Sequence, residues 1–418
     1  MGIQANLKPN IAIGDVNGDG FNDLVLGSEL ASNSASNSGS AWVIFSSLLD
    51  DFGTTTGNVK LLATGTNYNI RYDGANASDG LTRGGRAIAI GDINSDGVSD
   101  LVLGAYEADY GGGSSGSAYV MFSTLIDDVG TTTGNNKPLS TGTNYNIRYD
   151  GQTNDWFSIG GIFIGDINGD DMGDMVVDSY DIVVMFSTLI DDVGTTTGNN
   201  KPISVSTNYN IIYSDGGSSY LTGDINGDGL GDFVTGSGGA DNNGTWSGSV
   251  WLLFSTLIDD VGTTTGNSKS LNNASNFNIR YDGSVPYEHI SRYGDVVTHD
   301  LDLDGHLDLV IGSNNAAYVL YSTLIDDVGE STGNIKPFST STNYSIRYGG
   351  PSGSNMTSEN AMGAGDVNND GLPDLVFGDQ YSSNNGADSG SVWVIYGTPP
   401  PRYQTEGFIE ISGAVSFE

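Results

Sequence analysis

Acidic and amide side chains recur at a fixed spacing in six short loops of this chain. The pattern is Asp-x-(Asn/Asp)-x-Asp-x-x-x-Asp, and its first Asp stands at positions 15, 92, 166, 224, 300 and 366. Calcium takes six to eight hard oxygen ligands, and alternate positions of a tightly curled loop direct their oxygens inward. In the first loop Gly20 stands at position 6, where such a loop must turn sharply. The spacing therefore predicts calcium sites.

The first loop shows which atoms would bind the ion. Side-chain oxygens stand at positions 1, 3, 5 and 9, and position 7 offers its backbone carbonyl, which gives Asp15, Asn17, Asp19, Phe21 and Asp23. An EF-hand shares this opening but needs a bidentate Glu at position 12 and flanking helices. Position 12 of the six loops holds Leu26, Leu103, Val177, Thr235, Ile311 and Phe377, so the EF-hand is excluded. The alternative is that these residues form Asx turns without a metal.

The overall charge agrees with bound cations. The chain has 51 acidic and 14 basic residues and a net charge of −37, and only eight of its acids are Glu. Such a charge disfavours nucleic acid and anionic membranes as partners, whereas six calcium ions would return about +12. A halophile-type acidic surface is the alternative. No apolar run reaches the ~20 residues of a membrane helix. The first residues lack a signal-peptide pattern, so a signal, if the protein is exported, would lie outside this chain or take an unconventional form.

The loops belong to a repeated unit that predicts an all-β fold. Each unit holds four β-type segments, which in the second unit are 87–90, 101–104, 117–122 and 145–149, with no sustained helical periodicity. Four antiparallel strands repeated six times predict a β-propeller of four-stranded blades, rather than a β-solenoid. The expected single domain covers 1–418, with repeats at about 10–74, 75–151, 152–213, 214–283, 284–348 and 349–418. A seven-bladed parent is an alternative, and 408–412 is the candidate last strand of the sixth unit.

The repeated phrase GDINGDGxxDxVxG resembles the FG-GAP repeat of integrin α-subunit propellers, in which such a loop joins two strands of one blade. The match covers nearly the whole chain and is best in units one, two, four and six. The family's landmarks are eroded, because GSE at 27–29 and GAY at 104–106 stand where Gly-Ala-Pro is usual. The resemblance implies a calcium-binding propeller, but it does not transfer a ligand, since integrins also use a partner subunit to bind ligands.

Position by position, the resemblance extends the ligand set to the other five loops. In the second and third loops the implied ligands are Asp92, Asn94, Asp96, Val98 and Asp100, then Asp166, Asn168, Asp170, Met172 and Asp174. In the fourth they are Asp224, Asn226, Asp228, Leu230 and Asp232. In the fifth and sixth they are Asp300, Asp302, Asp304, His306 and Asp308, then Asp366, Asn368, Asp370, Leu372 and Asp374. Asp171 replaces Gly in the third loop and predicts a weaker site, whereas the four carboxylates of the fifth predict the tightest.

Catalytic patterns are scarce. The three histidines, His289, His299 and His306, have no triad context, and the chain has no Cys, P-loop, dinucleotide fingerprint or HExxH. We therefore expect the chain not to be an enzyme. The repeated segment LIDDVGTTTGN could form a second site through Asp127, Asp128 and Thr131, but we favour a hairpin whose Leu125 and Ile126 pack between blades.

The segments that differ most between units predict a binding surface. By the up-and-down order of a blade, these segments emerge on the face opposite the calcium loops. The candidate ligand-binding residues there are Tyr106, Tyr110, Trp156, Trp246, Tyr287, Arg292, Tyr293 and Tyr381, and the same segments carry Phe157 and His289. Three functions remain open: an extracellular or cell-surface adhesion or protein-binding module, a lectin, or a polysaccharide lyase or hydrolase on a calcium propeller.

Overall fold

The computed structural model is an all-β chain of six sheets. It describes residues 10–49, 56–84, 86–217, 219–259, 262–292, 296–314, 316–325, 329–349, 361–379, 382–383 and 389–397. The four strands expected in the second unit are present as β5 (Ile88–Gly91), β6 (Asp100–Ala105), β7 (Ser117–Met121) and β9 (Ile147–Asp150). Helices in the described residues are single short turns of at most five residues, as the absence of helical periodicity predicted. None of these helices is long and apolar enough to cross a membrane.

The strands of the other sheets follow the same order. The first sheet contains β1 (Ile11–Gly14), β2 (Asp23–Ser28), β3 (Ser40–Ile44), β4 (Ile70–Asp73) and β8 (Asn135–Pro138). The second adds β13 (Asn199–Pro202) to the four strands above. The third contains β10 (Ile162–Gly165), β11 (Asp174–Asp178), β12 (Ile182–Met185), β14 (Ile211–Ser214) and β18 (Asn267–Ser270). The fourth contains β15 (Ser219–Gly223), β16 (Asp232–Ser237), β17 (Ser249–Leu253), β19 (Ile279–Asp282) and β23 (Asn334–Pro337). The fifth has β20 (Val296–His299), β21 (Asp308–Gly312), β22 (Ala316–Leu320) and β24 (Ile346–Gly349), and the sixth has β25 (Met362–Gly365), β26 (Asp374–Asp379) and β27 (Ser391–Ile395).

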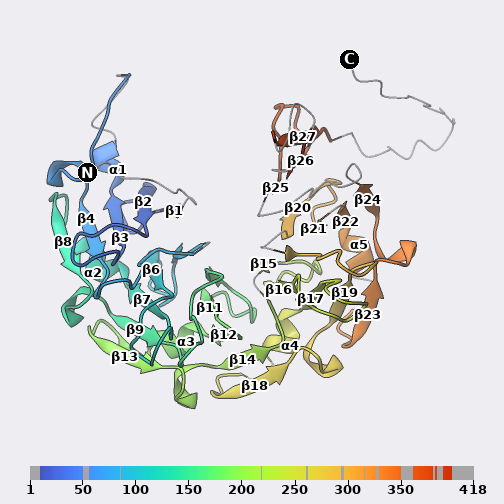
Figure 1. Cartoon of the computed structure of the whole chain (residues 1–418), viewed down its shortest axis with the longest axis horizontal. Coiled ribbons are helices and arrows are strands. Elements are labelled where there is room, and N and C mark those ends of the chain that lie inside the picture. Colours follow the sequence, from blue (N-terminus) through green and yellow to red (C-terminus); the bar gives the residue numbers. More distant parts are fainter. Residues whose placement is uncertain are drawn as a thin grey trace.

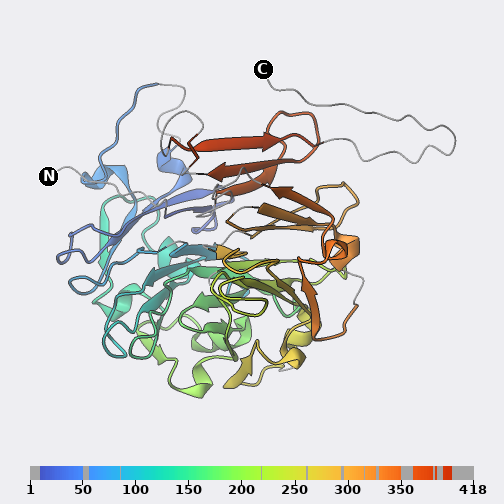
Figure 2. The same ribbon diagram turned by 45° about the vertical axis from the view of Figure 1, so that its right-hand side comes forward.

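The six sheets succeed one another along an arc. Figure 1 shows them in chain order, with strands such as β1 and β15 toward the inside and β8, β13, β18 and β23 on the outside. Figure 2 shows from another side that the sheet of β25–β27 follows the fifth sheet. Apolar clusters fill the spaces between neighbouring sheets, since each combines residues of two successive units. This arrangement is propeller-like.

The expectation of four-stranded antiparallel blades was wrong for four of the sheets. Their fifth strand comes from the next unit and pairs in parallel with the fourth strand, as β8 does with β4. A buried asparagine joins the two units. Asn146 Oδ1 accepts the N–H of Phe122 at 2.8 Å within its own unit, and its Nδ2 donates to the carbonyl of Thr196 in the next at 3.1 Å. Asn69, Asn210 and Asn278 do the same. In the fifth unit Ser345 stands at this position, and its Oγ accepts the Tyr321 N–H at 3.0 Å.

The segment LIDDVGTTTGN forms a short helix followed by this parallel strand, not a hairpin. The helices are α1 (Ser46–Leu49), α2 (Ser123–Asp127), α3 (Ser187–Ile190), α4 (Ser255–Asp259) and α5 (Ser322–Ile325). Short 3-10 turns are η2 (Gly65–Asn67), η3 (Gly142–Asn144), η4 (Asp191–Val193), η5 (Ser206–Asn208), η6 (Ala274–Asn276) and η9 (Ser341–Asn343). The packing of Leu125 and Ile126 between units is confirmed, because both belong to the cluster that joins the first and second sheets.

Candidate metal centre

Each predicted calcium loop connects the first two strands of its sheet, and its backbone is held by its own carboxylates. In the first loop Asp15 Oδ2 accepts the N–H of Gly20 at 2.7 Å, and Oδ1 accepts that of Asp19 at 3.1 Å. Asp19 Oδ1 in turn accepts the N–H of Phe21 at 2.9 Å. The same three bonds recur in the other five loops. Six different sequences therefore curl in one way.

The Asp at position 9 is buried and braces the loop against the segment after the third strand. In the second loop, Asp100 Oδ2 accepts the Ile93 N–H at 3.1 Å, and Oδ1 accepts the Ser123 N–H at 2.8 Å. All six loops repeat this pair of bonds. An ionised carboxylate has about four lone-pair sites, so two N–H bonds leave capacity for a cation.

Burial also changes the protonation of this position. Desolvation raises the pKa of Asp23 to about 6, and the hydrogen bonds to Ser46 and Val16 only partly oppose it. The same cause raises the pKa of Asp100 and Asp232 to about 7, of Asp174 to about 8 and of Asp308 to about 6. Neighbouring carboxylates of the loop add to the rise. A nearby divalent cation favours the ionised form of such a group.

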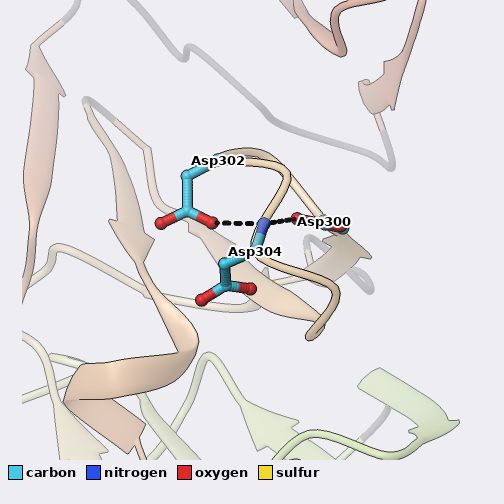
Figure 3. A group of neighbouring side chains, drawn as sticks. All are labelled: Asp300, Asp302 and Asp304. Atoms are coloured by element: carbon cyan, nitrogen blue, oxygen red, sulfur yellow. Dashed lines mark hydrogen bonds between the residues drawn. The ribbon is translucent and has the colours of Figure 1, made fainter. Parts of the chain in front are cut away.

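The fifth loop has the donor set that best fits a cation. Asp300, Asp302 and Asp304 offer oxygens that all lie within 4.8 Å of one another. Figure 3 shows the three residues on one curled loop. Two ligands on opposite sides of one calcium ion are about 4.6–5.2 Å apart, so these oxygens can share an ion. In the other loops an Asn at position 3 donates to the carboxylate at position 5, for example Asn94 to Asp96 at 3.1 Å. Asp302 has no such N–H, and its pKa is raised by burial and by Asp304.

The loop needs left-handed backbone at two positions, of which only one was anticipated. At position 6, Gly20 has φ 85°. Asp171, which replaces Gly at this position of the third loop, adopts the same left-handed conformation at φ 63°. Position 4 is also left-handed, with Gly18 at 74° but Leu303 at 61° in the fifth loop. A bulky residue is strained there. The loop with the most carboxylates at the predicted ligand positions therefore also carries the least suitable residue at position 4.

A serine that was not among the predicted ligands also lies next to the loop. In three units the first residue of the short helix donates its hydroxyl to the position-5 carboxylate, as Ser322 Oγ does to Asp304 at 3.0 Å. In the third and fourth units Ser187 Oγ and Ser255 Oγ are buried without a hydrogen-bond partner. The recurrent Ser after Phe or Tyr at positions 46, 123, 187, 255 and 322 was the available signal.

The opposite face holds the candidate ligand-binding residues in separate groups. The guanidinium of Arg83 lies 5.6 Å from the ring centre of Tyr106, and that of Arg148 lies 3.4 Å from that of Tyr110. Trp246 contacts Tyr287 and His289, whereas Trp156 is exposed in another unit and Arg292 is half-buried. Tyr293 and Tyr381 lie outside the described residues. The structure thus brings two of the eight predicted residues into mutual contact.

The fold and the six loops define a class of repeat protein, and a family comparison identifies it. The FG-GAP repeat model matches residues 9–44, 84–121, 216–253 and 360–395. These ranges contain the first, second, fourth and sixth loops, which are the four units that the sequence analysis found most typical. The chain therefore carries FG-GAP repeats in four places.

Curated relatives extend the comparison to whole proteins. The phosphatidylinositol-glycan-specific phospholipase D of Mus musculus is 31% identical over 189 residues, which cover 41% of this chain and 21% of the relative. The enzyme of the same name from Rattus norvegicus is 31% identical over 196 residues, with the same coverage. The chain thus spans about a fifth of the length of these relatives.

These names contradict the expectation that the chain is not an enzyme. That expectation rested on the few histidines and on missing catalytic motifs within the chain. Missing catalytic motifs within this chain do not reveal sequence similarity to part of a larger enzyme.

Solved structures give only distant likenesses. BBS1N in complex with ARL6DN aligns with 89% of this chain and 77% of its own at 9% identity and a TM-score of 0.39. A lectin of Agrocybe aegerita, described as recognising non-reducing terminal N-acetylglucosamine, aligns with 94% of this chain and 81% of its own, at 13% identity and a TM-score of 0.37. TM-scores this low support no inference about fold or ligand.

Proposed function

We propose that this chain is a calcium-stabilised propeller domain in which the six loops hold calcium ions between the first two strands of each blade. The observation that carries the proposal is the group of Asp300, Asp302 and Asp304, whose oxygens lie within 4.8 Å of one another. The other five loops share the backbone bonds of this loop. When bound, calcium supplies positive charge that neutralises the carboxylates and ties the loop to the segment after the third strand.

We further propose that the first and sixth sheets face each other, so that six blades close one ring. Val394 is 43% exposed, whereas Val120, at the same position of the second sheet, is fully buried against the third. The first sheet has an apolar face of its own, with a hollow of about 200 Å³ lined by Leu26, Ile44, Leu48, Leu49, Lys60, Leu62 and Asn67. Closure would cover both faces.

A matched pair of variants tests ring closure. If the ring closes, Val394→Asp lowers the free energy of unfolding by several kcal/mol, as Val120→Asp does, because each buries an unpaired charge. A change of less than about 0.5 kcal/mol for Val394→Asp alone would show that the first and sixth sheets do not pack on each other.

The role proposed for the domain is that of an extracellular binding module whose ligand lies on the face opposite the calcium loops. Extracellular calcium is abundant enough to fill sites with Kd values of about 10⁻⁴–10⁻³ M. The variable segments of that face support the role, since binding residues commonly lie on loops carried by a rigid scaffold.

Thermal unfolding with and without EDTA, combined with metal counting by mass spectrometry, tests the calcium proposal. An occupied site stabilises the fold by about 2.7 kcal/mol when free calcium is 100-fold above its Kd. We expect EDTA to lower the melting temperature, and added calcium but not magnesium to restore it. An unchanged melting temperature together with no bound calcium would overturn the proposal.

A further inference from the structure

Three junctions between loops on the face opposite the calcium loops have the same backbone conformation. Each joins the loop between the second and third strands to the segment that leads into the next sheet. The N–H of Trp156 donates to the carbonyl of Ser114 at 3.0 Å, the N–H of His289 to that of Trp246 at 3.1 Å, and the N–H of Gly80 to that of Asn37 at 3.3 Å. In each junction three residues, here called the tips, have positive φ. The tips are Asn37, Ser78 and Gly80 in the first junction, Ser114, Asn154 and Trp156 in the second, and Trp246, Tyr287 and His289 in the third.

The side chains at these equivalent tips differ completely. The first junction builds the backbone from small residues, whereas the last uses three rings, with Trp246 at φ 52°, Tyr287 at 62° and His289 at 53°. Left-handed backbone is unfavourable for bulky residues. Trp246 and Tyr287 also remain 52% and 59% exposed, so little burial offsets that strain. The first junction shows that this backbone forms without rings, and strained residues often mark functional sites.

The three rings form an open corner. The ring centres of Trp246 and Tyr287 are 5.8 Å apart and their planes are nearly perpendicular at 88°, while His289 lies 5.6 Å from Trp246. His289 Nδ1 lies 2.8 Å from the carbonyl of Gly238. A carbonyl only accepts, so Nδ1 carries the proton, and Nε2 of the neutral ring is an acceptor.

The corner is anchored from below. The buried side chain of Glu288, between two of the rings in sequence, accepts the Tyr318 hydroxyl at 2.6 Å and the Ser284 hydroxyl at 2.7 Å. The N–H of Tyr287 donates to the carbonyl of Thr245 at 2.8 Å. The rings are therefore preorganised, which reduces the entropy lost on binding.

We propose that this aromatic corner, Trp246 with Tyr287 and His289, binds a neutral saccharide. The C–H face of a pyranose can lie against one ring and its edge against the perpendicular ring, while a hydroxyl donates to His289 Nε2. The net charge of −37 disfavours acidic sugars and other anions. The inference rests on the proposed function, because the corner lies on the face proposed to bind the ligand and the repeats must be folded with calcium bound.

Titration of the calcium-loaded chain with methyl glycosides of glucose, galactose, mannose and N-acetylglucosamine tests the inference. Tryptophan fluorescence and saturation-transfer NMR would report binding. We expect at least one glycoside to bind. The triple variant Trp246→Asn, Tyr287→Ser and His289→Gly, which installs the tips of the first junction, should bind at least tenfold more weakly with an undiminished melting temperature in calcium. Tyr180→Ser, which removes an exposed ring of the third unit outside this corner, should bind as the unchanged chain does.

Several outcomes would overturn the inference. These are the absence of binding to all four glycosides, equal binding by the triple variant, or stronger binding of tetramethylammonium than of any glycoside at the corner, since exposed rings also attract organic cations. A large fall in the melting temperature of the triple variant would show that the rings are structural. Because calcium stabilisation is measured on the same samples, its loss identifies a failure of the calcium proposal separately.

Discussion

The two ends of these sheets, where the calcium loops and the opposite loops lie, differ in how much they vary from unit to unit. On the calcium-loop face, six loops with different sequences keep the same bonds, including a buried Asp that accepts two backbone N–H groups in every unit. On the opposite face, one backbone position holds Gly80, Trp156 or His289. The first face contains what folding requires of every unit. The second tolerates replacement, so function can vary there without altering the fold.

The protonation of the calcium-loop face should produce the largest contrast. In the metal-free chain the pKa values of Asp23, Asp100, Asp174, Asp232 and Asp308 lie at about 6 to 8, above their unfolded value near 3.9. The folded state therefore binds more protons between about pH 4 and 8, and its free energy of unfolding falls as pH rises through that window. In EDTA we expect a higher melting temperature at pH 5 than at pH 8.

If the loops bind calcium as proposed, the sign should reverse in calcium, because the ion would bind the deprotonated carboxylates and acid would release it. Differential scanning fluorimetry at both pH values, with EDTA or with calcium, checks the reversal. Parallel pH profiles in the two conditions would contradict it.

Removing one brace should have the next largest effect. Asp100→Ala leaves the buried N–H groups of Ile93 and Ser123 without their acceptor, and each costs about 1–3 kcal/mol. We expect a loss of about 2–5 kcal/mol in urea unfolding, with part of it persisting in EDTA. Asp127→Ala, exposed on α2, is the control and should change the free energy by less than about 0.5 kcal/mol.

The asparagine that joins successive units permits a graded test. Asn146→Ala removes both the acceptor for Phe122 and the donor to Thr196, and we expect it to cost about 1–3 kcal/mol. Asn146→Ser keeps an acceptor, as Ser345 does in the fifth unit, and should cost less. Equal losses in chemical denaturation would show that the bond from the Phe122 N–H does not contribute, whereas no loss for Asn146→Ser would show that the contact with the next unit does not.

A carboxylate at position 3 separates the fifth loop from the others, which have Asn there. Asp302→Asn restores an amide donor next to Asp304 and should weaken calcium binding there by about tenfold, or about 1.4 kcal/mol. It should also raise the metal-free melting temperature, because the repulsion is relieved. Asn94→Asp in the second loop is the reverse change and should tighten its site. Isothermal titration calorimetry measures both, and unchanged affinities would remove charge as the determinant.

The smallest effect is expected on the opposite face. Trp156→Gly places at this left-handed position the residue found at Gly80, and it should change the free energy of unfolding by less than about 0.5 kcal/mol. Its neighbour Phe157 is buried, so Phe157→Ala should cost about 3–5 kcal/mol. A comparable loss for Trp156→Gly would mean that this face is also constrained by the fold.

Much of this could be read from the sequence, because short-range patterns determine it. Alternating apolar residues located strands such as β5 and β7, and the spacing of Asp15, Asn17 and Asp19 located the loop. The parallel fifth strand was not predicted because Asn135–Pro138 has few residues that favour strands, and its partner Ile70–Asp73 lies in another unit. The left-handed position of Leu303 was missed because nothing about leucine indicates it. The contact between Trp246 and His289 joins two different loops, so it could not be predicted from the spacing of residues along the chain.

The parallel fifth strand also affects how the chain is made on the ribosome. β4 ends at Asp73, but its partner β8 begins only at Asn135. At about 5–20 residues per second, the outer edge of the first sheet waits roughly 3–12 s for its partner to be synthesised. The same delay recurs for each later sheet that receives a strand from its successor. A nascent chain therefore always exposes one open sheet edge, the kind of surface that chaperones shield and that aggregation exploits.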